Sequence, residues 1–182
     1  ITIGDNQYPK AIFTLWTEAE RNSINIYTIT IDESKRKDEK WYINTNMTYS
    51  FDGTNATGSY GDATAKKHAD TLYTAQDETD GLGTEGDVKV EGLKTILIRD
   101  VKAQAENELN RTDWYITRKS EKNTAIPSAI TTHRDAVRTK QDSMCTSITN
   151  ASDTPALETL YTYTTDSEGV QSRPLGELPT LK

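Results

Sequence analysis

The fold is decided by residues 93–151, which read LKTILIRDVKAQAENELN (93–110), RTDWYITRKSEKNTAIP (111–127) and SAITTHRDAVRTKQDSMCTSITNA (128–151). In the first and last of these segments apolar residues recur at three- and four-residue steps. Such spacing places apolar side chains on one face of a helix. We therefore expect helices over Leu93–Leu109 and Ser128–Ile148, packed antiparallel, with a compact polar and aromatic turn, Asn110–Lys119, between them.

The first 75 residues predict a small α+β domain. Thr17 and Glu20 have the spacing of a capping box, which predicts a short helix from Glu18 to about Ser23. Strands are indicated by alternating or β-branched residues in three further segments, Ile24–Ile31, Trp41–Phe51 and Asn55–Tyr60. We expect these three to form a small antiparallel sheet with one solvated face.

The remaining segments complete an α+β organisation in four parts. After the first domain (residues 1–75), residues 76–91 carry six acids, one lysine and three glycines, which predicts an acidic flexible linker. Residues 92–151 form the helical-pair module. Residues 152–182 are expected to form a short helix starting at Thr154-Pro155, a small hairpin, and an extended tail that is either frayed or laid along a partner.

Composition limits the classes of partner. The net charge is -7, and a protein that binds nucleic acid or anionic membrane over its whole surface needs a basic surface instead. No run of about 18 apolar residues is present, so we expect no membrane-spanning helix. Only 34% of residues are apolar, so the core must be thin, and contacts with copies or neighbouring proteins are expected to supply stability.

The segment Gly81–Gly86 matches the letters of a dinucleotide-binding fingerprint. That motif needs an apolar strand before it and phosphate-friendly charge around it, whereas the flanks here are acidic and polar. The segment also has enough acids for calcium but lacks the ligand spacing of an EF-hand. A flexible loop is the simpler interpretation of both patterns, and we predict no cofactor and no metal.

No residue pattern predicts an enzyme. His68 and His133 are far apart in sequence, with no cysteine or carboxylate at metal-ligand spacing, so each is interpreted as a solvated or capping histidine. No serine stands in a nucleophile-elbow context. Cys145 is the only cysteine, lies in a helix-like run and is interpreted as a buried thiol. The composition fits a protein synthesised in a reducing cytoplasm. We name no catalytic residue.

A local excess of positive charge lies between Arg111 and Lys140, with seven bases and three acids. Together with Trp114 and Tyr115, it would suit stacking on a single-stranded nucleic acid. The acidic balance of the whole chain favours a different interpretation, in which this basic face docks an acidic partner or the chain's own Gln76–Glu91 segment.

Two sets of motifs carry a family resemblance. The first comprises Leu109-Asn110-Arg111-Thr112-Asp113-Trp114, Arg118-Lys119-Ser120-Glu121, Ala125-Ile126-Pro127 and Thr132-His133-Arg134-Asp135-Ala136-Val137-Arg138. It resembles the helical module of bacteriophage tail-assembly-chaperone-like and tail-fibre-associated proteins, over about a third of the chain. The second, Tyr8-Pro9 with Trp16-Thr17-Glu18-Ala19-Glu20-Arg21 and Ile26-Tyr27, is similar to an N-terminal segment that often accompanies this module.

The resemblance implies a structural component of a bacteriophage tail, a tail, neck or fibre-attachment protein in the virion. It would be synthesised in the host cytoplasm and would contact other tail proteins and copies of itself, without nucleic acid or membrane. The alternative is a tail or tail-fibre assembly chaperone absent from the mature virion. The predicted partner-binding residues are Trp114, Arg118, Arg134 and Arg138, with Trp114 closing the end of the helical core and the two later arginines presenting a fork to carboxylates.

A third hypothesis comes from a different class of protein. Trp41, Tyr42 and Tyr49 are aromatic residues of the predicted sheet. Exposed together, such rings would suit a receptor-contact or carbohydrate-binding module for a host-surface glycan. The exposure of these three rings decides this alternative.

Overall fold

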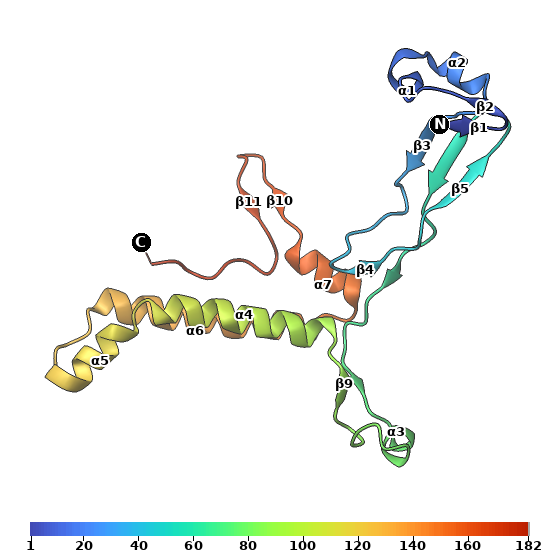
Figure 1. The fold of residues 1–182 in the computed structure, drawn as a ribbon. Coiled ribbons are helices and arrows are strands. Elements are labelled where there is room, and N and C mark those ends of the chain that lie inside the picture. The colour runs from blue at the N-terminus through green and yellow to red at the C-terminus, as the bar shows by residue number, and fades with distance from the viewer. Residues whose placement is uncertain (182) are drawn as a thin grey trace. The chain divides into compact units, whose positions relative to one another are not determined.

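The computed structural model describes residues 1–181 and divides the chain into two compact units, Ile1–Thr64 (unit 1) and a second that begins at Ala65 (unit 2). Helix accounts for 40% and strand for 16%, with small sheets and helices in succession along the chain (Figure 1). This confirms the predicted α+β class. The division falls after Thr64 and not at residue 75, because the segment after Ala65 is bonded to the helical module.

Unit 1 contains short elements connected by turns, and Figure 1 shows them at the blue end of the chain. Their bounds are β1 (Thr2–Ile3), β2 (Asn6–Gln7), α1 (Ile12–Leu15), α2 (Glu18–Asn22), β3 (Ile29–Asp32), β4 (Tyr42–Ile43), β5 (Thr48–Phe51) and β6 (Ala56–Ser59), with β7 (Thr64–Ala65) at the boundary. The predicted capping box is present: the Thr17 side chain accepts from the Glu20 N–H, and the Glu20 carboxylate accepts from the Thr17 N–H.

The sheet of unit 1 is mixed, with the strand order β3-β6-β5. β5 and β6 form the predicted antiparallel hairpin, whose turn is held by backbone N–H groups that donate to the Asp52 carboxylate. β3 pairs with β6 in parallel, so the expectation of a wholly antiparallel sheet is wrong. A parallel pairing needs a connection of about a dozen residues or more, and the segment after β3 is long enough to provide it.

The first predicted strand, Ile24–Ile31, is shortened for a local reason. Asn25 has a φ of +61°, which a strand does not accommodate. The Ile24 and Ile26 N–H groups both donate to the Arg21 carbonyl, so the chain leaves α2 through a tight turn. Only the last part of the segment is extended, and β3 begins at Ile29.

Unit 2 is built around two long helices. Its elements are β8 (Thr71–Leu72), α3 (Ala75–Thr79), β9 (Val88–Val90), α4 (Leu93–Asn110), α5 (Asp113–Lys122), α6 (Ser128–Asn150), α7 (Thr154–Tyr161), β10 (Thr164–Thr165) and β11 (Gln171–Ser172). α4 and α6 lie side by side (Figure 1). They run antiparallel, because Lys94 at the start of α4 donates to the Thr149 carbonyl and Glu108 near its end lies beside His133.

The core of the helical pair is formed by the predicted stripes. Leu97, Val101 and Ala105 of α4 are at most 4% exposed. They face a stripe of α6 whose apolar members are also buried, namely Ile130, Val137, Met144 and Ile148. Cys145, next to this stripe, is half-buried, and burial raises the pKa of its thiol. The helical pair is therefore a dry, two-layer core.

The segment predicted as a flexible linker, residues 76–91, contains ordered elements instead. The hairpin of β8 and β9 carries α3 in its loop, and Thr74 and Asp77 form a second capping box at the start of α3. Lys89 on β9 pairs with Asp77 across the hairpin. The excess of acids suggested a chain kept extended by repulsion, but hydrogen bonds to the acids that cap α3 and cross the hairpin give it local structure.

The end of the chain packs on unit 2 itself. The Leu175 N–H donates to the Leu160 carbonyl of α7, and Leu175 is only 2% exposed. Lys140 of α6 donates to the Leu175 carbonyl, and the Leu181 N–H donates to Glu108 of α4. We predicted a frayed tail or one laid along a partner, and both alternatives are corrected: the two prolines keep the segment extended, and buried Leu175 anchors it.

Candidate interaction surface

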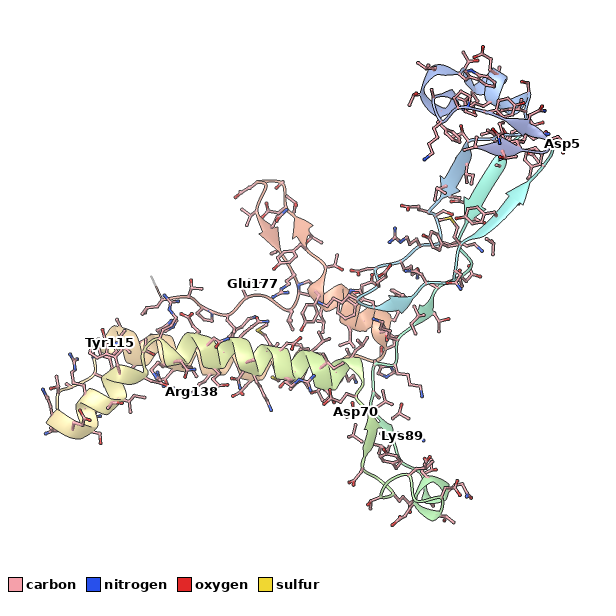
Figure 2. The ribbon with its side chains drawn as sticks, in the orientation of Figure 1. Asp5, Asp70, Lys89, Tyr115, Arg138 and Glu177 are labelled. Atoms are coloured by element: carbon pink, nitrogen blue, oxygen red, sulfur yellow. The ribbon has the colours of Figure 1, made fainter. Side chains whose placement is uncertain are left out.

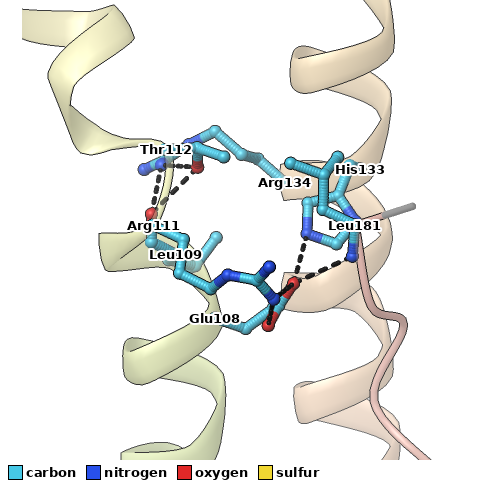
Figure 3. A network of polar contacts seen from close by, with 7 residues as sticks. All are labelled: Glu108, Leu109, Arg111, Thr112, His133, Arg134 and Leu181. Atoms are coloured by element: carbon cyan, nitrogen blue, oxygen red, sulfur yellow. Dashed lines mark hydrogen bonds and ion pairs between the residues drawn. The ribbon is translucent and has the colours of Figure 1, made fainter.

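Arg134, predicted to bind a partner, is buried inside unit 2. The residue is 7% exposed, and its Nη1 lies 2.8 Å from the Leu109 carbonyl and 2.7 Å from Thr112 Oγ1 (Figure 3). The same nitrogen lies 2.8 Å from Asp113 Oδ1. These three acceptors lie where α4 ends and α5 begins. The prediction for Arg134 is therefore corrected: its guanidinium joins α6 to the α4–α5 corner and is not available to a partner.

A second polar contact set surrounds Glu108, close to Arg134. Its two carboxylate oxygens accept from Arg111 Nη1, and one of them also accepts from the Leu181 N–H at 3.0 Å (Figure 3). These contacts hold the pKa of the Glu108 carboxyl below its ordinary value, the backbone N–H of Leu181 contributing most. Glu108 thus fixes the position of the chain's tail on the helical pair.

The predicted solvated or capping role of His133 is also wrong. It is 9% exposed, and its Nε2 lies 3.2 Å from Glu108 Oε1, close enough for an ion pair but without the alignment of a hydrogen bond (Figure 3). Its ring and the Leu181 N–H approach the same Glu108 oxygen. Among residues 1–181 no three His, Cys, Asp or Glu side chains are placed to hold a metal ion.

The insert between the long helices, predicted as a turn, is mostly the helix α5. It follows α4 after a two-residue corner whose Thr112 is 1% exposed and donates its hydroxyl to the Leu109 carbonyl. Asn123 ends α5 in the left-handed conformation, with its N–H donating to the Lys119 carbonyl. The ten residues of α5 lack a buried side chain, which is why no helical stripe was visible in the sequence.

We predicted that Trp114 closes the end of the helical core. The structure corrects this, because the residue is 52% exposed on α5. Its ring stacks on that of Tyr115 at a centroid distance of 3.8 Å. The Arg118 guanidinium lies over both rings, 4.7 Å and 5.2 Å from their centroids, and its Nε is buried without a hydrogen-bond partner among the described residues. We call Trp114, Tyr115 and Arg118 the aromatic–arginine cluster.

The aromatic–arginine cluster is a suitable contact surface on physical grounds. Exposed Trp, Tyr and Arg side chains carry more binding energy at protein interfaces than other residue types. The guanidinium held over the two rings is ordered before any partner arrives, so less side-chain entropy is lost on binding. The prediction that Trp114 and Arg118 contact a partner is therefore retained as a hypothesis.

Arg138, the fourth predicted residue, is exposed on α6 and separate from this cluster. It pairs with Asp135 at 3.3 Å, with both side chains at least half exposed (Figure 2). Arg134, one turn earlier, points into the molecule, so the predicted two-arginine fork does not form. Arg138 remains an available but isolated surface charge.

A second candidate surface lies on unit 1 and was not predicted. Two residues of the central strand β6 each pair with an apolar residue on both sides. Ala56 pairs with Ile29 of β3 and Phe51 of β5, and Gly58 pairs with Ile31 of β3 and Tyr49 of β5. Directly paired residues point to the same side of a sheet. Ile29, Ile31, Tyr49 and Phe51 therefore share one side, where they are 44–66% exposed, and we call them the apolar sheet face.

The apolar sheet face is tightly ordered despite its exposure. A Cβ atom on Gly58 would lie 2.8 Å from Met47 Sδ and 3.1 Å from the side chains of Ile31 and Tyr49, so these side chains close over the glycine. The alternation of apolar residues in β3 and β5 was visible in the sequence and suggested one buried side. What the sequence did not indicate is that the apolar side of β3 and β5 is left exposed, like their polar side.

Two of the three aromatic residues of the carbohydrate-binding hypothesis are inside the fold. Trp41 is 3% and Tyr42 is 5% exposed, whereas Tyr49 is 66% exposed on the apolar sheet face. A ring must be exposed to stack on a sugar. The glycan hypothesis therefore loses two of its three contact residues.

The acidic hairpin, residues 71–91, does not form a dinucleotide site. Gly81 and Gly86 have positive φ angles in the loop between α3 and β9. The dinucleotide motif requires a strand before the glycines and a long helix starting at them. Here a five-residue helix precedes the loop and a strand follows it, so the context that the dinucleotide motif requires is missing, and the loop belongs to an ordered hairpin.

The comparisons with known proteins add no assignment. No family model, curated protein or solved structure matches the chain. Within the described part of the chain, no helix has both the length and the apolar character to cross a bilayer. Function must therefore be argued from the two surfaces described above.

Proposed function

We propose that this chain is a structural component of a bacteriophage tail, a tail, neck or fibre-attachment protein that acts through protein–protein contacts in the virion. The observation that carries the proposal is the apolar sheet face. A contiguous exposed apolar patch on a soluble protein often marks an interaction site. That the assembly is a phage tail is inferred from the resemblance carried by residues 109–138.

The balance of buried and exposed side chains in unit 1 supports the proposal. Its buried apolar residues are Ile12, Trp41 and Tyr42. Its large apolar side chains that remain exposed are more numerous, namely Ile1, Phe13, Leu15, Ile29, Ile31, Ile43, Tyr49 and Phe51. A unit with so little internal core gains stability when a neighbouring protein covers these side chains, as happens in a permanent assembly.

Mass spectrometry of purified virions tests the proposal directly. We expect peptides of this chain at a fixed ratio to the known tail proteins, in particles purified away from lysate. Abundance in infected cells together with absence from purified particles would replace the proposal with the assembly-chaperone alternative, because a chaperone leaves before the particle is complete.

A pair of variants tests whether the apolar sheet face makes the contact. Ile31→Ser with Tyr49→Ser removes apolar surface from the exposed face, and we expect normal folding by circular dichroism but loss of incorporation. The matched control, Thr30→Ala with Ser50→Ala, changes neighbouring residues that point to the other side of the same strands. Incorporation of both variants at the level of the unaltered protein would remove the apolar sheet face from the proposal.

A further inference from the structure

The two ends of the helical pair in unit 2 carry opposite charge. At one end the acidic hairpin, residues 71–91, contains six acids and one base, a net charge of -5. At the other end the α5 corner, residues 111–122, contains four bases and two acids, a net charge of +2. We call these the acidic end and the basic end.

Much of this charge is unpaired. Within residues 1–181, the acidic-end residues Glu78, Asp80, Glu85 and Asp87 make no ion pair. At the basic end, Arg111 pairs with Glu108, and Asp113 pairs with Arg134. Lys119 and Lys122 are exposed and make no ion pair among the described residues, while the half-buried Arg118 lies over the Trp114 and Tyr115 rings.

The two ends of one copy cannot neutralise each other. The acidic hairpin joins the first turn of α4, and α5 follows its last turn, as Lys89 and Tyr115 show in Figure 2. α4 has 18 residues, so it separates the ends by about 27 Å at 1.5 Å per residue. This is about three times the Debye length of about 8 Å at physiological ionic strength, so the attraction between them is screened. Docking of the basic face on the chain's own acidic segment, as considered from the sequence, is therefore ruled out by geometry.

Both ends also expose apolar side chains. Trp114 and Ile116 of the basic end are 52% and 44% exposed. The acidic end exposes four aliphatic side chains at 47–60%, namely Leu72, Leu82, Val88 and Val90. Leu72 and Val88 are directly paired across the hairpin and so lie on one side of it. Each end therefore combines an apolar contact area with charge of one sign.

We propose that the basic end of one copy docks on the acidic end of a second copy of this chain. The occupant is a second copy because the chain itself supplies the surface of opposite charge that its other end needs. Two copies laid antiparallel make the contact twice and close as a dimer, whereas copies in a row make it once per neighbour. This contact between copies rests on the proposed function as a tail protein, but it can be tested with the purified chain, without virions.

Sedimentation velocity of the purified full chain tests the contact. We expect concentration-dependent self-association at about 50 mM salt that weakens at least about tenfold at about 500 mM, because the charges at both ends are exposed and screened. The basic-end variant Lys119→Glu/Lys122→Glu and the acidic-end variant Asp80→Lys/Glu85→Lys/Asp87→Lys are each expected to be monomeric. Circular dichroism checks that both remain folded.

Mixing the two variants gives the sharpest outcome. Each variant keeps one unaltered end, so an equimolar mixture is expected to form a one-to-one heterodimer although neither variant associates alone. The matched control Lys10→Glu/Lys102→Glu lowers the net charge by as much as the basic-end variant does, at exposed positions outside residues 71–91 and 111–122, and it should associate like the unaltered chain. Trp114→Ala should weaken association at least about tenfold without unfolding the chain.

Three results would overturn the proposal: a monomeric unaltered chain up to about 200 μM at low salt, a monomeric mixture of the two variants, or equal loss of association in the control. None of these bears on virion incorporation. Conversely, absence of the chain from virions would overturn the proposed function and leave the self-contact standing.

Discussion

The helical pair of unit 2 and the sheet of unit 1 use the same kind of side chain in opposite ways. Val101, Val137 and Ile148 are at most 2% exposed between α4 and α6. Ile31 and Tyr49 of the sheet are 44% and 66% exposed. Both sets belong to regular elements with the expected periodicity. Periodicity therefore identifies an apolar face but does not say which molecule covers it.

The difference separates stability from assembly. The helical pair buries its apolar stripes within one chain, so its stability should not depend on a partner. The apolar sheet face makes its own contacts over Gly58, and Tyr27 packs on Phe51, but its four side chains stay 44–66% exposed. We therefore expect mutations in the helical pair to change the free energy of unfolding, and mutations on the sheet face to change incorporation into an assembly.

The largest expected effect comes from one substitution made in both regions. Ile148→Ala removes a fully buried side chain from the helical pair and should lower the free energy of unfolding by about 2–5 kcal/mol. Ile31→Ala makes the same chemical change at a half-exposed position and should lower it by less than about 1 kcal/mol. Urea unfolding followed by circular dichroism measures both values.

The variants Ile148→Ala and Ile31→Ala test the contrast between the helical pair and the apolar sheet face. Equal losses for the two variants would mean that the apolar sheet face is as important for the isolated chain as the helical core, and the argument for a covering partner would then fail. A loss for Ile148→Ala below about 1 kcal/mol would mean that the helical pair is not the dry core described above.

The next largest effect is expected at Arg134, a buried charged residue of the helical pair. Arg134→Ala leaves the Leu109 carbonyl and Thr112 Oγ1 without their guanidinium donor, which should cost about 1–3 kcal/mol of unfolding free energy. Arg134→Lys should recover only part of this, because an ammonium lacks the planar donor fork. Chemical denaturation of these variants gives the values.

Arg138→Ala is the control for Arg134, because it removes an exposed arginine from the same helix. Its ion pair with Asp135 lies in solvent, so the expected change is below about 0.5 kcal/mol. If Arg138→Ala were as destabilising as Arg134→Ala, the assignment of Arg134 as the residue that holds the α4–α5 corner would be wrong.

The smallest expected effect is the contribution of Asp77 to stability in the acidic hairpin, which has neither a dry core nor a large sheet. The pKa of Asp77 is lowered to about 2, chiefly by the hydrogen bond from Lys89 and then by those from Thr74. A carboxyl whose pKa is lowered by folding stabilises the fold above its ordinary value of 3.8. That contribution is lost as the pH falls from about 4 toward 2.

An NMR titration of the Asp77 carboxyl carbon measures this pKa. Lys89→Met removes the ammonium and should move the Asp77 pKa upward, toward 3.8, while the capping bonds from Thr74 keep it somewhat lower. A pKa that stays near 2 in the Lys89→Met variant would show that the cross-hairpin pair does not hold the carboxylate.

Local signals in the sequence were sufficient for α2, α4, α6 and α7, but not for the short α1 and α3 or for α5. The apolar stripes predicted α4 and α6, the Thr17–Glu20 capping box predicted α2, and Thr154-Pro155 predicted the start of α7. Each of these signals acts between residues close together in the chain. The α+β class followed from them.

Two of the errors concern interactions between distant segments, and a third concerns the adjacent residues Trp114 and Tyr115. The parallel pairing of β3 with β6 depends on the path of the intervening chain, not on either strand. Arg134 carries a charge that usually marks a surface residue, and its burial is explained by the acceptors of Leu109, Thr112 and Asp113 that surround its guanidinium. Trp114 was assigned to the core because it is large and apolar, but its ring instead stacks on Tyr115 beneath Arg118.

The anchored tail has a consequence for the order in which unit 2 folds. Its bond from the Leu181 N–H to Glu108 closes a loop across 73 positions of sequence, whereas the helical pair is joined by the short segment through α5. Loop-closure entropy delays long-range contacts, so we expect the helices to form first and the tail to dock after the rate-limiting step. Contacts made that late slow unfolding without speeding folding, so the tail should act mainly as a kinetic latch on the helical pair.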